Sequence, residues 1–189
     1  MPPAKERADA ARNRRAILDA TAALLDERGA EGVTMDRVAA AAGVGKGTIF
    51  HRFGSRAGLL HEMVAERAFA LRARVVDGPP PLGPGAPAAD RLRAFFAAMA
   101  ELLIDNLELM AIVRTEPPHP RTAELHRFWR EHITTLLAQV RPDLDAETVG
   151  RLLLDSLAGA TVPELARSGE TDRLLAAVRE LVDSVLPAR

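Results

Sequence analysis

Residues 33–60 have the sequence VTMDRVAAAAGVGKGTIFHRFGSRAGLL, in which two short segments with helical spacing lie on either side of a glycine. The hydroxyl of Thr34 can cap the exposed N–H groups of a helix that begins here, and Asp36 suits the positive end of that helix's dipole. Apolar side chains recur at helical spacing up to Gly43, which can take the positive φ that ends a helix. The pattern therefore predicts a first helix of about two turns.

The segment after Gly43 is predicted to form a second helix with two unlike faces. Ile49 and Phe53 are four residues apart, so they share one face and can pack back against the first helix. The opposite face is left for a partner and carries Gly47, Thr48 and His51, with Lys46 and Phe50 at its flanks.

Glycines in this second segment need a reason, because glycine in a helix costs roughly 1 kcal/mol relative to alanine. A close approach to a sugar-phosphate backbone or a base edge supplies one, since a missing side chain lets a helix enter the major groove more deeply. The alternative is a helical hairpin, loosened by Gly45 and Gly47, inside an α protein of any function.

The run GVGKGTIFHRFGSRAGLL, residues 43–60, resembles the recognition helix and fourth-helix start of TetR-family transcriptional regulators, and the match covers roughly residues 12–60. The resemblance implies an all-α chain, with an N-terminal three-helix DNA-binding domain that contains a helix-turn-helix and a C-terminal helical domain for ligand binding and dimerisation. It also implies that the operator is faced by Lys46, Gly47, Thr48, Phe50 and His51.

The same resemblance implies phosphate contacts from Thr34 and from Arg56, which stands where the family usually has a lysine. We add Arg37 and Arg52, two further cations of the segment, to the expected DNA-binding set. One residue departs from the family pattern, because Phe50 stands where tyrosine is common. Phenylalanine lacks the phenolic hydrogen bond to phosphate but can still contact a thymine methyl group or a sugar.

The charge distribution agrees with a local docking surface. Residues 1–60 hold ten lysines and arginines against seven carboxylates, whereas the remainder holds fifteen against nineteen. With a formal net charge of −1, the chain is not suited to coating nucleic acid non-specifically.

Length and composition limit the number of compact units, the kind of core and the cell compartment that we expect. The 189 residues are 48% hydrophobic and 4% aromatic, enough for one or two compact units with an aliphatic core. No run of about 18 uncharged apolar residues occurs, and the N-terminus lacks the apolar centre of a signal peptide. We therefore expect a cytoplasmic protein with no membrane partner, which the absence of cysteine also fits.

Apolar stretches with helical spacing, separated by proline and glycine, predict helices throughout the chain. We expect a DNA-binding domain at residues 1–54, with residues 1–9 disordered, and an effector-binding and dimerisation domain at residues 55–189. The run GPPPLGPGAP, residues 78–87, is expected to be a surface loop because proline removes helical donors.

The middle helices, predicted at about residues 90–106, 107–114 and 121–140, concentrate the aromatic and methionine side chains. Such residues with one or two polar groups suit a small-molecule pocket between helices, but they suit a bundle core equally well. The resemblance favours a pocket for an effector whose identity the sequence does not give. The candidate ligand-binding residues are Phe95, Phe96, Met99, Leu103, Met110, Phe128, Trp129 and His132.

The last two helices, predicted at about residues 146–167 and 172–186, have wide apolar faces. They suit a four-helix dimer interface, which the resemblance implies, or they close the core of the monomer. The candidate interface residues are Leu152, Leu153, Leu157, Ala160, Leu174, Val178, Leu181, Val182 and Val185.

Enzyme motifs do not fit the chain. Gly45-Lys46-Gly47-Thr48 lacks the glycine and Ser/Thr spacing of a phosphate loop, and His61-Glu62 lacks the second histidine of a metalloprotease helix. We expect no catalytic residue, metal or cofactor. The favoured interpretation is a homodimeric repressor that a small-molecule effector releases from a palindromic double-stranded operator. The alternative is an all-α ligand-binding or scaffold protein without DNA function.

Overall fold

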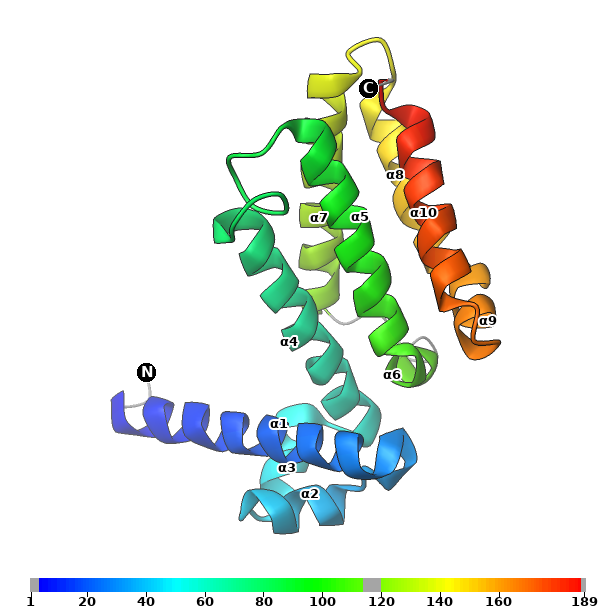
Figure 1. Cartoon of the computed structure of the whole chain (residues 1–189). Helices are drawn as coiled ribbons and strands as arrows, with labels where there is room; N and C mark the ends of the chain where they lie inside the picture. Colours follow the sequence, from blue (N-terminus) through cyan, green and yellow to red (C-terminus); the bar gives the residue numbers. More distant parts are fainter. Residues whose placement is uncertain (1–3, 114–119, 188–189) are drawn as a thin grey trace. The chain divides into compact units, whose positions relative to one another are not determined.

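The computed structural model of the chain describes residues 4–113 and 120–187. All regular secondary structure in these residues is α-helical, which confirms the predicted fold class. The helices, shown in chain order in Figure 1, are α1 (Ala4–Gly32), α2 (Met35–Ala42), α3 (Lys46–Phe53), α4 (Arg56–Asp77), α5 (Ala88–Asp105), α6 (Leu107–Val113), α7 (Pro120–Val140), α8 (Ala146–Ala158), α9 (Thr161–Arg167) and α10 (Thr171–Val185).

The described residues divide into two compact units. The head unit contains residues 4–65 and 108–113, and the body unit contains residues 66–107 and 120–187. The division falls inside α4, so the first turns of this helix belong to the head. Helix α1 begins at Ala4, so residues 4–9, which we expected to be disordered, are helical in the structure; residues 1–3 lie outside the described part.

Local signals in the head unit act as the sequence predicts. Thr34 is the N-cap of α2, and its side-chain oxygen accepts a hydrogen bond from the Arg37 N–H at 3.3 Å. Helix α2 ends at Gly43, whose φ of 64° lies in the left-handed region that favours glycine. Ser55 accepts from the Gly58 N–H at 3.0 Å and so caps the start of α4 at Arg56.

The head unit is held together by an apolar core that draws on every one of its helices. Fully buried side chains come from α1, the α1–α2 connection, α2, α3 and α4, and Leu109 of α6 joins them. The members with no exposed surface are Ile17, Val33, Val38, Ile49, Leu59 and Leu60. This core fixes α3 by its inner face alone.

Backbone groups between α1 and α2 are satisfied by two distant side chains. Helix geometry is interrupted at Gly29, which has φ 65° and ψ −178°. The Arg56 guanidinium donates to the carbonyl oxygen of Val33 at 2.7 Å and to that of Ala30 at 2.5 Å. Glu108 accepts from the Ala30 N–H at 3.3 Å. Arg56 and Glu108 therefore tie the same turn through its carbonyl and amide groups.

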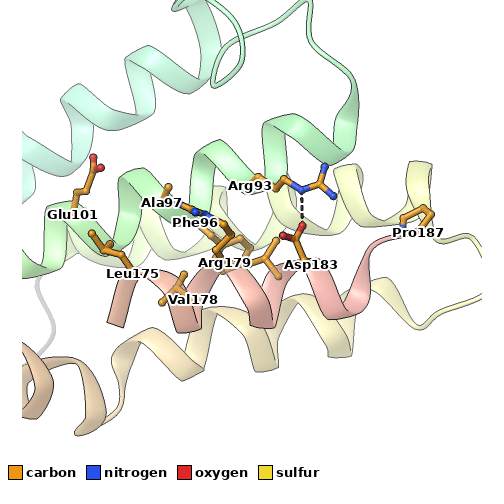
Figure 2. Close-up of a pocket in the computed structure, with 10 residues that line it drawn as sticks. Arg93, Phe96, Ala97, Glu101, Leu175, Val178, Arg179, Asp183 and Pro187 are labelled. Carbon is orange, nitrogen blue, oxygen red and sulfur yellow. Dashed lines mark hydrogen bonds and ion pairs between the residues drawn. The ribbon is translucent and has the colours of Figure 1, made fainter. Parts of the chain in front are cut away.

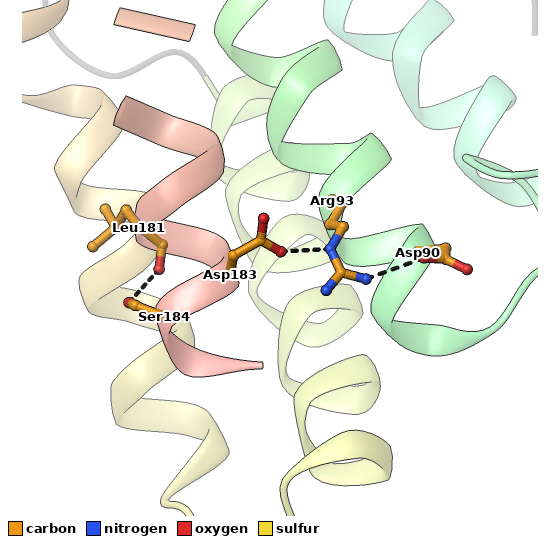
Figure 3. Close-up of polar contacts among 5 residues, drawn as sticks. All are labelled: Asp90, Arg93, Leu181, Asp183 and Ser184. Atoms are coloured by element: carbon orange, nitrogen blue, oxygen red, sulfur yellow. Dashed lines mark hydrogen bonds and ion pairs between the residues drawn. The ribbon is translucent and has the colours of Figure 1, made fainter. Parts of the chain in front are cut away.

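In the body unit, α5 packs against α7 and α10, and α7 packs against α8 (Figure 1). Arg93 of α5 donates to Asp183 of α10 at 2.5 Å and to Asp90 at 3.1 Å (Figure 3). These two carboxylates raise the pKa of Arg93 above its ordinary value. The expected loop lies between α4 and α5, at residues 78–87.

One predicted helix is divided in the structure. The expected helix over residues 146–167 is two helices, α8 and α9, because Gly159 takes an extended backbone with φ −71° and ψ 179°. Pro163 lies in the first turn of α9, where its missing N–H would have no intrahelical partner. The break between the two helices thus precedes the proline.

His132 of α7 lies among the aromatic side chains of the body. Its ring centroid is 5.4 Å from that of Phe95 and 6.0 Å from that of Phe128, on which it stacks. Burial, and next the positive charge of Arg91, lower the pKa of His132 from 6.5 to about 4. The imidazole is therefore neutral at pH 7.

We expect Arg56→Met to lower the free energy of unfolding of the head unit by about 2–4 kcal/mol, because two hydrogen bonds from a charged donor are lost. The matched control is Arg52→Met, which removes an exposed arginine and should change stability by less than about 0.5 kcal/mol. Far-UV circular dichroism in denaturant is the measurement, since the single tryptophan reports on the body. Equal stability of the two variants would contradict this role of Arg56.

We also expect the body to lose stability in mild acid through His132. The unfolded chain takes up a proton as the pH falls below about 6.5, whereas the folded state resists protonation down to a pKa of about 4. The free energy of unfolding should thus fall between these pH values, by roughly 1–2 kcal/mol after allowance for solvent screening of a half-buried ring. Unfolding of the wild type and of His132→Gln, followed by tryptophan fluorescence at several pH values, checks this. Only the wild type should show this contribution to the pH dependence of the free energy of unfolding.

Candidate nucleic-acid interface

Helix α3 separates its inward and outward residues clearly. Ile49 has no exposed surface and Phe53 is 8% exposed, so both belong to the head core. The other face is open to solvent, including Phe50, whose side chain is 44% exposed. The exposed residues that the sequence assigned to a partner are Lys46, Gly47, Thr48, Phe50, His51 and Arg52.

The glycines of this face leave room for a close approach. A Cβ atom added at Gly47 would meet nothing within 4 Å, and one added at Gly45 would lie 3.8 Å from the Thr48 hydroxyl oxygen. Neither glycine has a positive φ. Backbone conformation therefore does not require glycine at either position, and internal packing does not require it at Gly47.

The charged side chains of this face come from both α2 and α3. Lys46 of α3 forms an ion pair with Asp36 of α2 at 2.8 Å, and both side chains are largely exposed. The ammonium group also lies 6.0 Å from the centroid of the Phe50 ring. Exposed ion pairs contribute little stability, so a phosphate group can replace Asp36 as the partner of Lys46. No local pattern in the sequence marks Asp36 as the partner of Lys46.

The remaining predicted DNA-binding residues lie around α2. Arg37 is exposed, and its guanidinium donates to the carbonyl oxygen of Gly32 at 3.1 Å. Thr34 is half-buried and uses its hydroxyl oxygen in the cap of α2. Arg56 is also half-buried, and its hydrogen bonds to Ala30 and Val33 give it a structural role that the resemblance did not imply.

One predicted ligand-binding residue lines a cavity of the body unit, and several others form an aromatic cluster. A cavity of about 520 Å³ lies between α5 and α10, and Phe96 is the member of the predicted set that lines it (Figure 2). Phe95, Phe128, Trp129 and His132 form an aromatic cluster, in which neighbouring ring centroids lie 5.0–6.0 Å apart. Phe96 joins this cluster, because its ring centroid lies 5.3 Å from that of Phe95.

The other three members of that set lie in different surroundings. Met99 is buried in the core of the body, and Leu103 is half-buried against the same core. Met110 is on α6, in the head unit.

Five of the predicted interface residues are buried inside the body unit of the single chain. Leu153, Leu157, Leu174, Val178 and Val182 are buried in its core within the single chain, because α8 and α10 turn these side chains inward. Val185 packs partly buried against the same core. The exposed members of the set are Leu152, which is 66% exposed, Leu181, which is 42% exposed, and Ala160.

Two other kinds of site are not seen in the described residues. Within them, no three histidine or acidic side chains are grouped so that they could hold a metal ion. No described helix is long and apolar enough to cross a membrane.

Comparisons with known proteins place this geometry in a family. Residues 17–63 match the family described as "Bacterial regulatory proteins, tetR family". Among curated proteins, no sequence matches the chain significantly. The matched segment runs from the buried Ile17 through α2 and α3 into the first turns of α4, which are the helices that carry the core and the exposed face described above.

Solved structures share the fold over nearly the whole chain. The TetR-family regulator PfmR from Thermus thermophilus is 25% identical, with a TM-score of 0.56, and the match covers 90% of this chain and 96% of that one. The regulator FadR from Bacillus subtilis, solved in complex with stearoyl-CoA, is 17% identical, with a TM-score of 0.64 and coverage of 91% and 97%.

FadR from Bacillus halodurans is similar to the same degree, at 18% identity and a TM-score of 0.63, with coverage of 93% and 95%. The open outer face of α3 lies inside the matched segment, and this segment identifies the chain as a member of the TetR family of bacterial transcriptional regulators.

Proposed function

We propose that this DNA-binding regulator is a homodimeric repressor that leaves a palindromic operator when a small molecule binds its body unit. The observation that carries the proposal is the outward face of α3, where small and cationic residues are exposed while Ile49 and Phe53 hold the helix from behind. A helix held in this way can enter a major groove without disturbing the head core.

On this proposal the exposed residues divide by role. Gly47, Thr48 and His51 face the base edges, and Phe50 makes apolar contact with a thymine methyl group or a sugar. Lys46, Arg37 and Arg52 neutralise phosphates, so binding should weaken steeply with added salt.

The two half-buried residues, Thr34 and Arg56, have different roles. Thr34 can still donate its hydroxyl proton to a phosphate, since its cap uses the oxygen as an acceptor. Arg56 acts mainly as a positioning residue, because its guanidinium is held by the carbonyl groups of Ala30 and Val33. Arg56 would therefore affect DNA binding through the placement of α2 and α3.

The effector is assigned to the body unit, where the aromatic cluster lies. FadR from Bacillus subtilis was solved with stearoyl-CoA, but at 17% identity this similarity supports a shared fold and does not transfer the ligand. As the mechanism, we propose that the effector displaces α4, whose residues belong to both units, and so changes the separation of the two α3 helices in the dimer. By linkage, operator must weaken effector binding by the same factor.

A dimer interface formed by α8 and α10 follows from the residues that remain exposed. Leu152 and Leu181 are large apolar side chains on these two helices, and the body core does not cover them. A palindromic operator needs a two-fold contact between protomers. We propose that these leucines and Ala160 contribute to that contact.

The direct test is fluorescence anisotropy with the duplex that flanks the protein's own coding region, with unrelated duplex as competitor and salt varied. Gly47→Ala should weaken specific binding about tenfold, because a methyl group then stands between α3 and the groove. The same variant should keep or gain up to about 1 kcal/mol of stability, since alanine favours the helix and its Cβ meets nothing within 4 Å. Loss of stability, or unchanged binding, would contradict the assignment of this face.

For the dimer, Leu181→Glu should weaken self-association by at least about tenfold, because an apolar contact is replaced by a charge that must be desolvated. Val76→Glu is a matched control, since Val76 of α4 is 43% exposed and Leu181 is 42% exposed. Sedimentation velocity over a concentration series distinguishes the two variants. If both remain dimeric to the same extent, the interface lies elsewhere.

A further inference from the structure

Arg91 of α5 is a half-buried cation with unsatisfied hydrogen-bonding capacity. Its Nη2 donates to the carbonyl oxygen of Val75, in α4, at 3.2 Å. Its Nε–H is buried and has no acceptor. Among the described residues no carboxylate forms an ion pair with Arg91, in contrast to Arg93, which has both Asp183 and Asp90.

His132 of α7 carries a second unsatisfied buried atom. Its Nε2 is buried without a partner, and Arg91 acts on it electrostatically. The ring is held between Phe95 and Phe128, and Phe95 also lies 5.3 Å from Trp129 between ring centroids. An aromatic wall thus surrounds a neutral imidazole next to an arginine.

Each of these unsatisfied atoms has a free-energy cost in the unliganded protein. Leaving a buried donor or acceptor unpaired costs about 1–3 kcal/mol, and more when the group is charged. A cation that is partly removed from water without a counter-ion also has a cost, and a well-placed anion reduces it. A group that accepts from both nitrogens and carries negative charge would remove both costs.

We propose that the body unit binds an amphipathic monocarboxylate, whose carboxylate accepts from Arg91 Nε and His132 Nε2 and whose apolar part packs on Phe128 and Trp129. The inference rests on the proposed function and gives the effector its chemical class. Arginine prefers a carboxylate because two oxygens can accept from its fork of donors. The aromatic rings favour an apolar chain or ring over a sugar or a nucleotide.

The cavity between α5 and α10 is a weaker candidate for this anion. Arg93, at one end of it, is already neutralised by Asp183, and Glu101 adds a further negative charge to its lining (Figure 2). Arg179 is the other cation of this lining and is exposed. Substituting Arg179 therefore separates binding in this cavity from binding at Arg91.

Trp129 makes the test direct, because it is the single tryptophan of the chain and lies 5.0 Å from Phe128 and 5.3 Å from Phe95 between ring centroids. The probes are decanoate and phenylbutyrate, each titrated beside its primary amide, which keeps the shape but removes the charge. Tryptophan fluorescence and calorimetry are recorded on the full-length wild type, Arg91→Met, Arg179→Met, His132→Gln and His132→Leu.

We expect the carboxylates to bind the wild type at least about tenfold more tightly than the amides, and Arg91→Met to remove this preference. Arg179→Met should bind as the wild type does. His132→Gln, which keeps a side-chain N–H donor, should retain more affinity than His132→Leu. Without ligand, Arg91→Met should raise the denaturant midpoint of the body, since an uncompensated cation is removed.

Equal binding of acids and amides, binding unaffected by Arg91→Met, or no binding of either carboxylate would overturn the inference, with ordered water then the partner of these nitrogens. A lower midpoint for unliganded Arg91→Met would also oppose it. Operator binding is measured on the same samples. If specific DNA binding is present while the carboxylates fail, the regulator stands and only the ligand class is wrong; if specific DNA binding is absent, the proposed function fails by itself.

Discussion

The turn between α1 and α2 is the constraint on which the reading head depends. Helix α1 stops being regular at Gly29, and the polar backbone that follows must find partners before the chain can start α2 at Met35. Arg56, from the start of α4, and Glu108, from α6, supply them. Because α3 follows α2 after a few residues, the placement of this turn also sets where the outward face of α3 points.

The residues that anchor α3 in the core differ from the residues that α3 exposes. This division explains how one short helix can serve both the fold and the function. Ile49 and Phe53 satisfy the core, so no outward residue is needed for packing. Gly47 would gain helix stability as alanine, which makes its presence a cost to the fold. A residue that the fold does not require, on a face that the fold leaves open, indicates that the face serves another purpose.

Much of the head could be predicted from sequence because its signals are local. A threonine cap, a glycine with positive φ and a four-residue apolar spacing each act over a single turn, and the structure confirms all three at Thr34, Gly43 and Ile49. Side-chain partners distant in sequence could not be found in this way. Nothing in the sequence around Arg56 or Arg91 distinguishes an arginine that caps carbonyl groups or lacks a counter-ion from one in solvent. The sequence could not decide whether the apolar faces of α8 and α10 pack in the monomer core or in a dimer interface. Both kinds of packing produce the same apolar pattern in the sequence.

The ion pair between Lys46 and Asp36 bears on how the protein discriminates among the many sites of a chromosome. On the proposed interface, a phosphate that reaches Lys46 must first displace the carboxylate of Asp36. This cost is small, but it applies at every duplex, while only a site with matching bases offers the extra contacts that offset it. If Lys46 contacts DNA as proposed, the negative charge beside it would shorten the time that the protein spends on unrelated DNA and leave more of it free to find an operator.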